Sequence, residues 1–137
     1  MLLAVEPGVL GVIAEGLGAT IDVSDLVAPA AGTRHYVELL ETNTYNAWLI
    51  VWAPSGSLDP HDHGGSAGAV HVVHGRLFET YVDEPGRPLR TRAADTGESL
   101  TIPPDRIHEV WNPTQEMAVS VHVYSPPLRD MKFYEFD

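Results

Sequence analysis

The sequence predicts an all-β protein, either a sandwich or a barrel, with short helices near its start. Glycine and proline are frequent, with 12 and 11 positions among 137 residues, so turns are expected throughout the chain. Between the turns lie short runs of β-branched and aromatic side chains, and no helical pattern separates these runs after residue 46. The length suits one domain with a single hydrophobic core.

The first thirty residues predict one or two short helices. Ser24 or Asp25 is placed to cap a turn in this region. The stretch carries Glu6 and Glu15 and lacks a basic start, so it does not resemble a signal peptide. No later run is long enough to span a membrane, and no membrane association is expected. Apolar side chains recur at mixed helical spacing at Val9, Leu10, Val12, Ile13 and Leu17.

From residue 46 onward the pattern predicts strands. The aromatic and β-branched run NAWLIVWAP, at 46–54, predicts a buried strand, and 68–83 predicts two strands that meet at Gly75. The polar stretch at 82–98 is expected to be an exposed loop. Further short strands, separated by Pro, Gly or Asn, are expected at 98–104, 108–113, 117–127 and 132–137.

The charge balance and the lack of cysteine exclude several classes of function. Nineteen acidic residues against eight basic ones give a formal charge of −11, so a nucleic-acid partner is not expected. Without cysteine the chain can form no disulfide, no thiolate zinc site and no cysteine nucleophile. The same lack makes a cytoplasmic location the expectation.

Two histidines one residue apart are the first candidate metal ligands. His61 and His63 flank Asp62 within PHDHGGSAGAVHVVHG, residues 60–75, which holds four of the seven histidines. Alternate residues of a strand point to the same side, so both imidazoles would face one site if the segment is extended. The alternative is an exposed turn, because Asp, Pro and Gly surround both histidines.

The spacing further along the chain resembles the second signature of the cupin jelly rolls. The residues that match the spacing of this second signature are Gly97, Pro103, His108 and Asn112. Upstream, residues 56–75 are similar to the first cupin signature. The resemblance implies a cupin jelly-roll barrel and places His61, His63 and His108 at ligand positions. A single cupin domain over 1–137 is therefore expected, with an N-terminal helical segment at 1–33 and the β-barrel at 34–137.

The predicted ligand set contains no carboxylate. Most metal-binding cupins have a glutamate four or five residues beyond the second histidine, where this chain has Ala67 and Gly68. Three neutral imidazoles suit a first-row divalent metal, and iron(II) held by three facial ligands keeps three positions open. Without a ligand carboxylate, the higher charge of the site favours an anionic substrate group, such as a thiolate, together with O₂.

Three segments, HDHGGSAGAVHVVHGRLFET, IHEVWN and VSVHVYSPP, together resemble the cysteine dioxygenase (thiol dioxygenase) type I family of cupins, over residues from about 34 to the end. The resemblance implies a non-haem iron(II) enzyme that uses O₂ to oxidise a small thiol, foremost L-cysteine, to its sulfinic acid. The implied iron ligands are His61, His63 and His108. The expected partners are thus a small-molecule thiol and O₂, and the expected assembly is a monomer or small homo-oligomer.

The resemblance also implies an outer relay formed by Ser120, His122 and Tyr124, which one face of a strand can carry. The Tyr124 hydroxyl would donate to bound oxygen or to a substrate carboxylate. His122 would hold its orientation, and Ser120 would fix the imidazole tautomer. The alternative is an ordinary amphipathic strand. The Ser125–Pro126 bond matches a turn in which the family has a cis peptide.

The choice of substrate is the least defined part of the resemblance. An arginine before the first strand binds the substrate carboxylate in cysteine-using members, and Arg34 is the candidate here. If the alignment shifts, Val37 takes this position. Relatives that use 3-mercaptopropionate have a glutamine there, which neither alignment supplies. Mammalian members carry a cysteine cross-linked to the tyrosine where this chain has Gly68, so Tyr124 is expected to be unmodified.

Two other functions stay open. One is a different cupin oxygenase that cleaves a carbon–carbon bond, and the other is a non-catalytic metal-binding cupin. The Ser-His-Tyr relay favours thiol oxidation over the first, and the complete set of three histidines argues against the second. Of the remaining histidines, His35 is a candidate for lining the substrate pocket, whereas His71 and His74 are expected to be exposed or to line the core on opposite faces of a strand.

Overall fold

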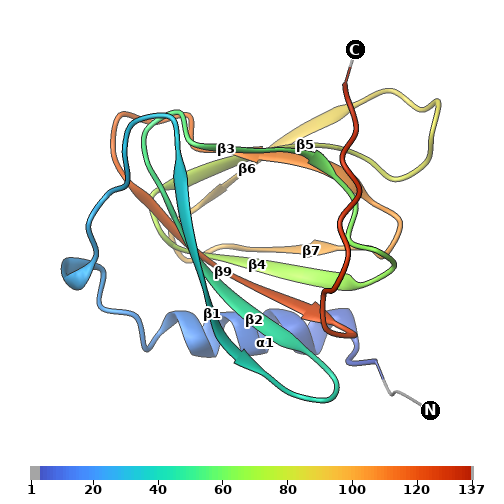
Figure 1. Ribbon diagram of the computed structural model, residues 1–137, viewed down its shortest axis with the longest axis horizontal. Coiled ribbons are helices and arrows are strands. Elements are labelled where there is room, and N and C mark those ends of the chain that lie inside the picture. Colours follow the sequence, from blue (N-terminus) through green and yellow to red (C-terminus); the bar gives the residue numbers. More distant parts are fainter. Residues whose placement is uncertain (1–3, 137) are drawn as a thin grey trace.

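The computed structural model describes residues 4–136, which form mainly two antiparallel sheets that face each other (Figure 1). Within this range the larger sheet has the strand order β1 (Arg34–Glu41), β2 (Asn46–Trp52), β9 (Ala118–Ser125), β4 (Ala67–His74) and β7 (Ser99–Ile102). The smaller sheet has the order β3 (Ser57–His61), β8 (Ile107–Trp111), β5 (Arg76–Val82) and β6 (Arg90–Asp95). The all-β prediction is confirmed. Residues 1–3 and 137, parts of the expected helical segment and last strand, lie outside the described range.

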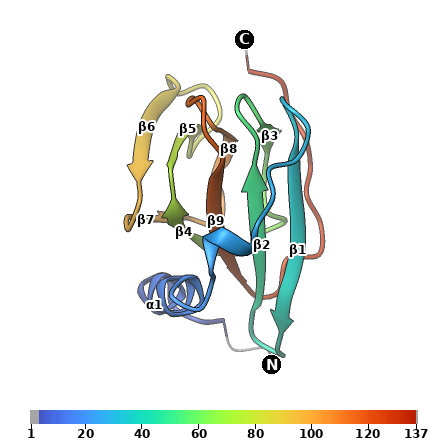
Figure 2. The ribbon, with the colours of Figure 1, turned by 90° about the vertical axis from the view of Figure 1, so that its left-hand side faces the viewer.

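Helix α1 (Pro7–Gly18) lies along the outer face of the larger sheet (Figures 1 and 2). Its proline occupies the first turn, where the missing N–H has no helical partner to lose. Leu10 and Ala14 are fully buried and pack in one cluster with Val119, Val121 and Val123 of β9. The helix ends close to β4, where a Cβ on Gly18 would lie 2.9 Å from Cδ2 of His71. Only glycine allows this approach without a shift.

A short 3-10 helix (Val23–Asp25) follows α1. The side chain of Asp22 accepts a hydrogen bond from the backbone N–H of Ser24 at 3.0 Å. The capping residue is therefore Asp22, and the prediction of Ser24 or Asp25 is wrong, because a cap precedes the first turned residue. None of the helices in residues 4–136 is long and apolar enough to cross a membrane.

Strand β9 separates the two halves of the core. Its odd-numbered residues face α1, whereas its even-numbered residues face the space between the sheets, as strand alternation requires. At one end this space is filled by an apolar cluster that includes Trp52, Leu77, Val110 and Ala118. Further along β9 the inward side chains become polar, and these are Ser120, His122 and Tyr124.

Two predictions of secondary structure are wrong. Residues 90–95, expected in a loop, form β6, which pairs with β5 at the edge of the smaller sheet. An edge strand can carry polar side chains toward water, and in β6 only Ala94 is buried. The expected strand at 132–137 is, within the described residues, an isolated bridge between Phe133 and His61. A segment that forms only one bridge has no alternating pattern of its own, so the sequence cannot distinguish it from a short strand.

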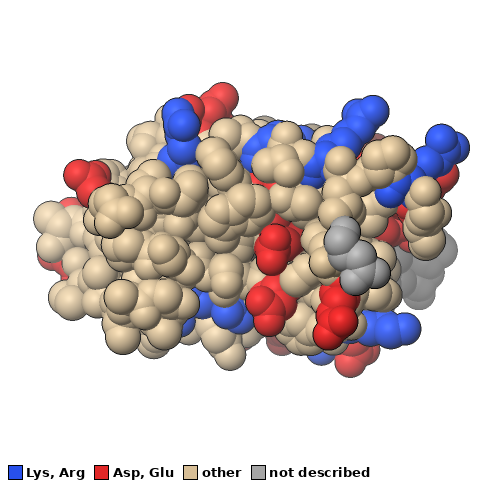
Figure 3. Space-filling view, turned by 90° about the horizontal axis from the view of Figure 1, so that it is seen from above, with Lys and Arg blue, Asp and Glu red and all other residues tan. Residues whose placement is uncertain are grey.

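Charges of both signs are interspersed on the side of the molecule that holds the smaller sheet (Figure 3). On this side Arg76 of β5 and Asp95 of β6 form an exposed ion pair at 2.5 Å. Exposed pairs of this kind contribute little to stability, because water screens the charges. The fold therefore depends on the two apolar clusters rather than on surface ion pairs.

Candidate metal centre

Three histidines from two paired strands and an adjoining turn meet between the sheets. His61 ends β3 and lies opposite His108 of β8 in the register, while His63 follows two residues later. Strand alternation does not explain the position of His63, because this residue lies beyond the end of β3. A turn through Gly64 and Gly65, with φ of 58° and 90°, follows His63 and leads the chain into β4.

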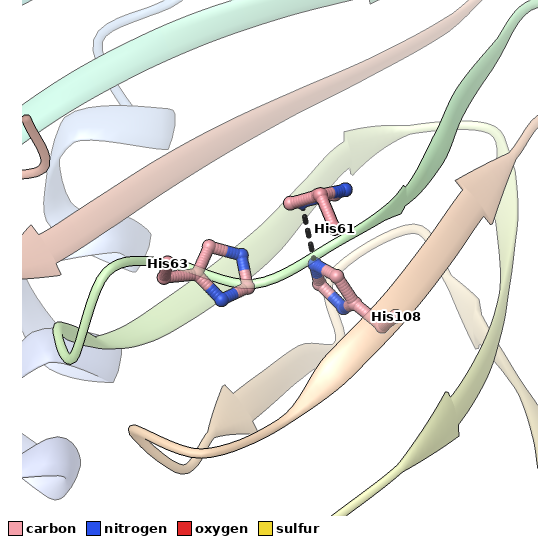
Figure 4. A group of neighbouring side chains, drawn as sticks. All are labelled: His61, His63 and His108. Carbon is pink, nitrogen blue, oxygen red and sulfur yellow. Dashed lines mark hydrogen bonds between the residues drawn. The ribbon is translucent and has the colours of Figure 1, made fainter. Parts of the chain in front are cut away.

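The three imidazoles surround one point (Figure 4). One ring nitrogen from each of His61, His63 and His108 lies within 4.8 Å of the others. All three side chains are at most 1% exposed. The ring centroids are 4.7 to 4.8 Å apart, with the rings edge to face. This arrangement could hold a metal ion.

The hydrogen bonds outside the cluster leave lone pairs that point inward. His61 Nδ1 is 2.7 Å from the carbonyl oxygen of Asp59, and His108 Nδ1 is 2.6 Å from Oε2 of Glu79. Both oxygens only accept, so both Nδ1 atoms carry the ring proton and both Nε2 atoms carry a lone pair.

These two lone pairs face each other across 3.2 Å, the contact drawn dashed in Figure 4. Two acceptors this close repel unless a cation lies beside them. Neither ring nitrogen of the buried His63 has a hydrogen-bond partner, although buried polar atoms normally have one. The donor set therefore fits a divalent metal that prefers imidazole nitrogen.

Glu79 is a member of this site that no motif in the sequence identifies. It lies on β5, is 1% exposed, and accepts from Arg92 Nε at 2.5 Å and from Arg106 Nη1 at 3.5 Å, besides its contact with His108. Burial alone would raise the pKa of Glu79, but the hydrogen bonds and charges of His108 and Arg92 outweigh it and lower the pKa. A carboxylate is thus within reach of the cluster, one hydrogen bond behind His108. The one sequence signal for Glu79 was its acidic side chain at a position of the strand that faces inward.

Glu79→Gln is expected to weaken metal binding by about 10- to 100-fold, because the charge that orients and polarises His108 is lost. Competition with a chromogenic chelator measures the affinity. Glu109→Gln, one residue beyond His108 on the other side of β8, is the matched control and should change the affinity little. An unchanged affinity in Glu79→Gln would restrict Glu79 to its ion pairs with Arg92 and Arg106.

The metal-free protein is expected to lose stability as the pH falls below about 6.5. Burial, and then the charge of His108, lowers the pKa of His61 to about 3, and burial likewise lowers the pKa of His63 and that of His122, the latter to about 3. Once unfolded, each imidazole takes up a proton near its ordinary pKa of 6.5, so unfolding binds protons and acid favours it.

Each of these histidines should therefore lower the free energy of unfolding by about 1 kcal/mol between pH 7 and about pH 5.5. Urea denaturation at the two pH values measures this change. Equal free energies at both would mean that the folded protein binds as many protons as the unfolded chain.

Ser120, His122 and Tyr124 form a continuous hydrogen-bond chain along β9. Ser120 Oγ lies 2.7 Å from His122 Nε2, and His122 Nδ1 lies 3.3 Å from the hydroxyl of Tyr124. Burial raises the pKa of Tyr124, so the phenol stays protonated, and the low pKa of His122 keeps its imidazole neutral. The alternative of an amphipathic strand is wrong, because all eight residues of β9 are buried. The Tyr124 ring stacks on His63 at 5.2 Å and joins the chain to the histidine cluster.

A cavity of about 240 Å³ opens beside this chain and is lined by Arg34, His122 and Tyr124. Arg34 Nη1 donates to the carbonyl oxygen of Ser57 at 3.1 Å, but Arg34 Nε and Trp48 Nε1 are buried without a hydrogen-bond partner. Two unpaired donors beside an apolar wall suit a ligand with an apolar body and acceptor oxygens. The apolar wall consists of Trp48, Ile50, Leu58, Leu128, Met131 and Phe133.

The other candidate residues lie outside this cavity. His35 is exposed and does not line the cavity, and neither does Val37, which is 47% exposed. His71 is buried against α1, where its Nδ1 lies 2.8 Å from Ser99 Oγ. His74 is half-buried at the end of β4.

A comparison with protein families matches residues 28–136 to "Cysteine dioxygenase type I".

The chain belongs to the cysteine dioxygenase type I family, within the cupin superfamily.

Curated relatives of this family member include cysteine dioxygenase type 1 of Danio rerio, which is 28% identical over 100 residues. The alignment covers 66% of this chain and 50% of the relative, so the chain spans about half the length of that protein.

Solved structures with a similar fold include an oxalate oxidase in complex with glycolate, with a TM-score of 0.67 at 21% identity over 78% of this chain and 59% of the other. A protein with a double-stranded β-helix domain from Klebsiella pneumoniae also has a TM-score of 0.67 at 21% identity, over 85% of this chain and 96% of the other. At these identities the likeness concerns the fold, and it confirms the predicted cupin jelly-roll barrel.

Two features near Tyr124 agree with the resemblance of the sequence to the cysteine dioxygenase type I family. The Ser125–Pro126 peptide bond is cis, as that resemblance implies. Gly68 of β4 lies opposite Tyr124 in the register, and a Cβ on Gly68 would lie 2.9 Å from Cδ1 of the tyrosine. The position at which mammalian members carry the cross-linked cysteine therefore faces the ring. Because the chain has no cysteine, Tyr124 carries no thioether.

The segment after β9 closes one side of the cavity in this family member. It runs from the larger sheet toward the smaller one (Figure 1) and contributes Leu128, Met131 and Phe133 to the cavity wall. Asp62, between the two histidines, fastens it. Its Oδ1 accepts from the backbone N–H of Lys132 at 3.0 Å, and its Oδ2 accepts from the Tyr134 hydroxyl at 2.9 Å.

Proposed function

We propose that this chain is a thiol dioxygenase that uses iron(II) and O₂ to oxidise a small thiol, with L-cysteine the first candidate, to its sulfinic acid. One thiol and one O₂ give one sulfinic acid, with both oxygen atoms on sulfur, so no further reductant is required. The observation that carries the proposal is that Tyr124 stacks on His63 of the three-histidine cluster and, as the end of the Ser-His-Tyr chain, also lines a small cavity. Family membership supports the same reaction.

In this proposal His61, His63 and His108 hold the metal through one nitrogen each. Bound iron(II) would supply positive charge that favours the thiolate and electrons that activate O₂. The cavity, whose walls are mainly apolar, would hold the substrate on the side of Tyr124 and so place its thiol near the cluster. The stacked Tyr124 ring covers His63, and its hydroxyl is available to bind oxygen atoms of a ligand.

Arg34 is proposed to bind the substrate carboxylate. Its side chain lines the cavity, and its Nε atom is a buried donor that still lacks an acceptor. The bond from Nη1 to the Ser57 carbonyl fixes the guanidinium, so little freedom is lost when an anion binds. The Trp48 indole N–H supplies a second unpaired donor in the same cavity.

A second candidate substrate is 3-mercaptopropionate. Within residues 4–136, the side chains that line the cavity include Arg34 but no aspartate or glutamate that would pair with the ammonium group of L-cysteine. A thiol carboxylate without an amine would therefore leave fewer charges unpaired. The glutamine that the resemblance associates with 3-mercaptopropionate does not occupy the position of Arg34. The residues therefore favour neither substrate alone, and both belong in the test.

The test is oxygen consumption by the iron(II)-loaded protein with L-cysteine, 3-mercaptopropionate and cysteamine, followed by mass spectrometry of the product. Uptake of one O₂ for each sulfinic acid formed is expected for one or both carboxylate thiols, and cysteamine should be slower. Zinc-loaded protein is the control and should consume none. Bound iron without uptake for any thiol would instead support another cupin oxygenase or a non-catalytic metal-binding cupin.

A further inference from the structure

We propose that Trp52 is a positioning residue that fixes the direction of the hydrogen-bond chain on β9, so that the Tyr124 hydroxyl donates its proton into the cavity. Trp52 lies on the neighbouring strand β2 and is fully buried. Its indole Nε1 lies 2.9 Å from Ser120 Oγ and so adds a fourth member behind the three residues of the relay. Only the activity arm of the test below rests on the proposed function.

Ser120 lies between Trp52 and His122 in this chain. An indole N–H can only donate, so the Ser120 oxygen must accept from Trp52. Ser120 is fully buried, and its remaining side-chain partner is His122 Nε2 at 2.7 Å. The Ser120 proton is therefore donated to His122 Nε2, because buried hydroxyl groups rarely lack an acceptor.

A neutral imidazole such as that of His122 carries a single ring proton. With Nε2 of His122 accepting, that proton is on Nδ1, which donates to the Tyr124 oxygen at 3.3 Å. The Tyr124 oxygen is then an acceptor within the chain, and its own proton points away from His122. Tyr124 lines the cavity beside Arg34, so the proton is available to an oxygen atom of a bound ligand.

The reverse direction is incompatible with Trp52. In that arrangement His122 Nε2 would donate to Ser120, which already accepts from Trp52, and the Ser120 proton would need another acceptor. Trp52 cannot be that acceptor. A water molecule or a hydroxyl in place of the indole could accept, and the chain could then run either way, with the Tyr124 proton directed to His122 and withheld from the cavity.

The tautomer of His122 tests the inference without any turnover. In ¹⁵N-histidine-labelled full chain loaded with diamagnetic Zn(II), we expect the ¹⁵N shifts of the His122 ring to report a proton on Nδ1 alone. His122→Gln assigns the signals among the seven histidines. In Trp52→Phe, whose smaller ring leaves room for water, the two tautomers should mix. A proton on Nε2 in the wild-type protein, or an unchanged tautomer in Trp52→Phe, would overturn the proposal.

A double-mutant cycle gives the activity arm. We expect Trp52→Phe to lower kcat for thiol-dependent oxygen uptake by roughly three- to tenfold with little change in KM, as expected for one lost hydrogen bond. Combined with Ser120→Ala, it should lower kcat no further than Ser120→Ala alone, because Trp52 acts through Ser120. If the two substitutions lowered kcat by the product of their separate effects, Trp52 would act independently of Ser120. Trp111→Phe, which removes an indole outside the cavity, is the matched control.

The two arms separate the two proposals. A wild-type protein that oxidises no thiol would contradict the proposed function, while the His122 tautomer would still decide the direction of the chain. An active enzyme with the proton on Nε2 would keep the function and remove Trp52 from its positioning role.

Discussion

His108→Ala is expected to abolish metal binding and thiol-dependent oxygen uptake together. The substitution removes one of the three nitrogens proposed to bind the metal and leaves two imidazoles, too few for the proposed site. It also deprives the buried Glu79 of its contact with His108. Iron content by mass spectrometry and oxygen uptake with L-cysteine and 3-mercaptopropionate measure the two losses.

The matched control is His74→Ala, which removes a half-buried histidine at the end of β4, outside the cluster. This variant should keep both its iron and its activity. If His108→Ala retained a full complement of iron and normal turnover, His108 would not be a ligand. The cluster would then require a different explanation for its opposed lone pairs.

Tyr124→Phe is expected to lower kcat by about a hundredfold while the iron content stays unchanged. Loss of one positioned donor from a buried site typically has an effect of about this size, and the ring that stacks on His63 is retained. Because burial raises the pKa of Tyr124, the hydroxyl stays protonated through neutral pH, and kcat should show no loss from ionisation of this phenol there.

The measurement is kcat at saturating thiol together with the iron content of the same sample. Tyr45→Phe, in the apolar cluster around α1 and outside the cavity, is the control for the loss of a phenol hydroxyl. A Tyr124→Phe variant as fast as the wild-type protein would remove the hydroxyl from the mechanism. A variant that also loses iron would mean that the hydroxyl supports the cluster itself.

The sequence was sufficient for residues related by short spacing. The strand that carries Ser120, His122 and Tyr124 and the two strands that meet at Gly75 follow from local patterns. The spacing of His61 and His63 marked both as candidates, although His63 lies in a turn and not on the expected strand. Alternation along β9 correctly places its three polar residues on one face, because a strand has a fixed period of two.

Residues that meet across strands could not be predicted in this way. Glu79 reaches His108 through the pairing of β5 with β8, and Trp52 reaches Ser120 through the pairing of β2 with β9. Strand order and register set both contacts, and neither is encoded in a local motif. The same limit applies to β6. This strand lies at the edge of the smaller sheet and carries mainly polar side chains, so its sequence shows no strand pattern.

Asp62 connects two parts of the protein that would otherwise move separately, the segment after β9 and the turn after His63. One carboxylate holds the backbone of Lys132 and the side chain of Tyr134, and it also accepts from the N–H of Gly64 in the turn after His63. A rotation of the Asp62 carboxylate away from these partners would therefore release the cavity wall and the turn after His63 in the same event. Release of a bound metal ion and entry of bulky ligands should then require the same local opening. Amide hydrogen exchange at Gly64 and Lys132 should detect this opening at the same rate.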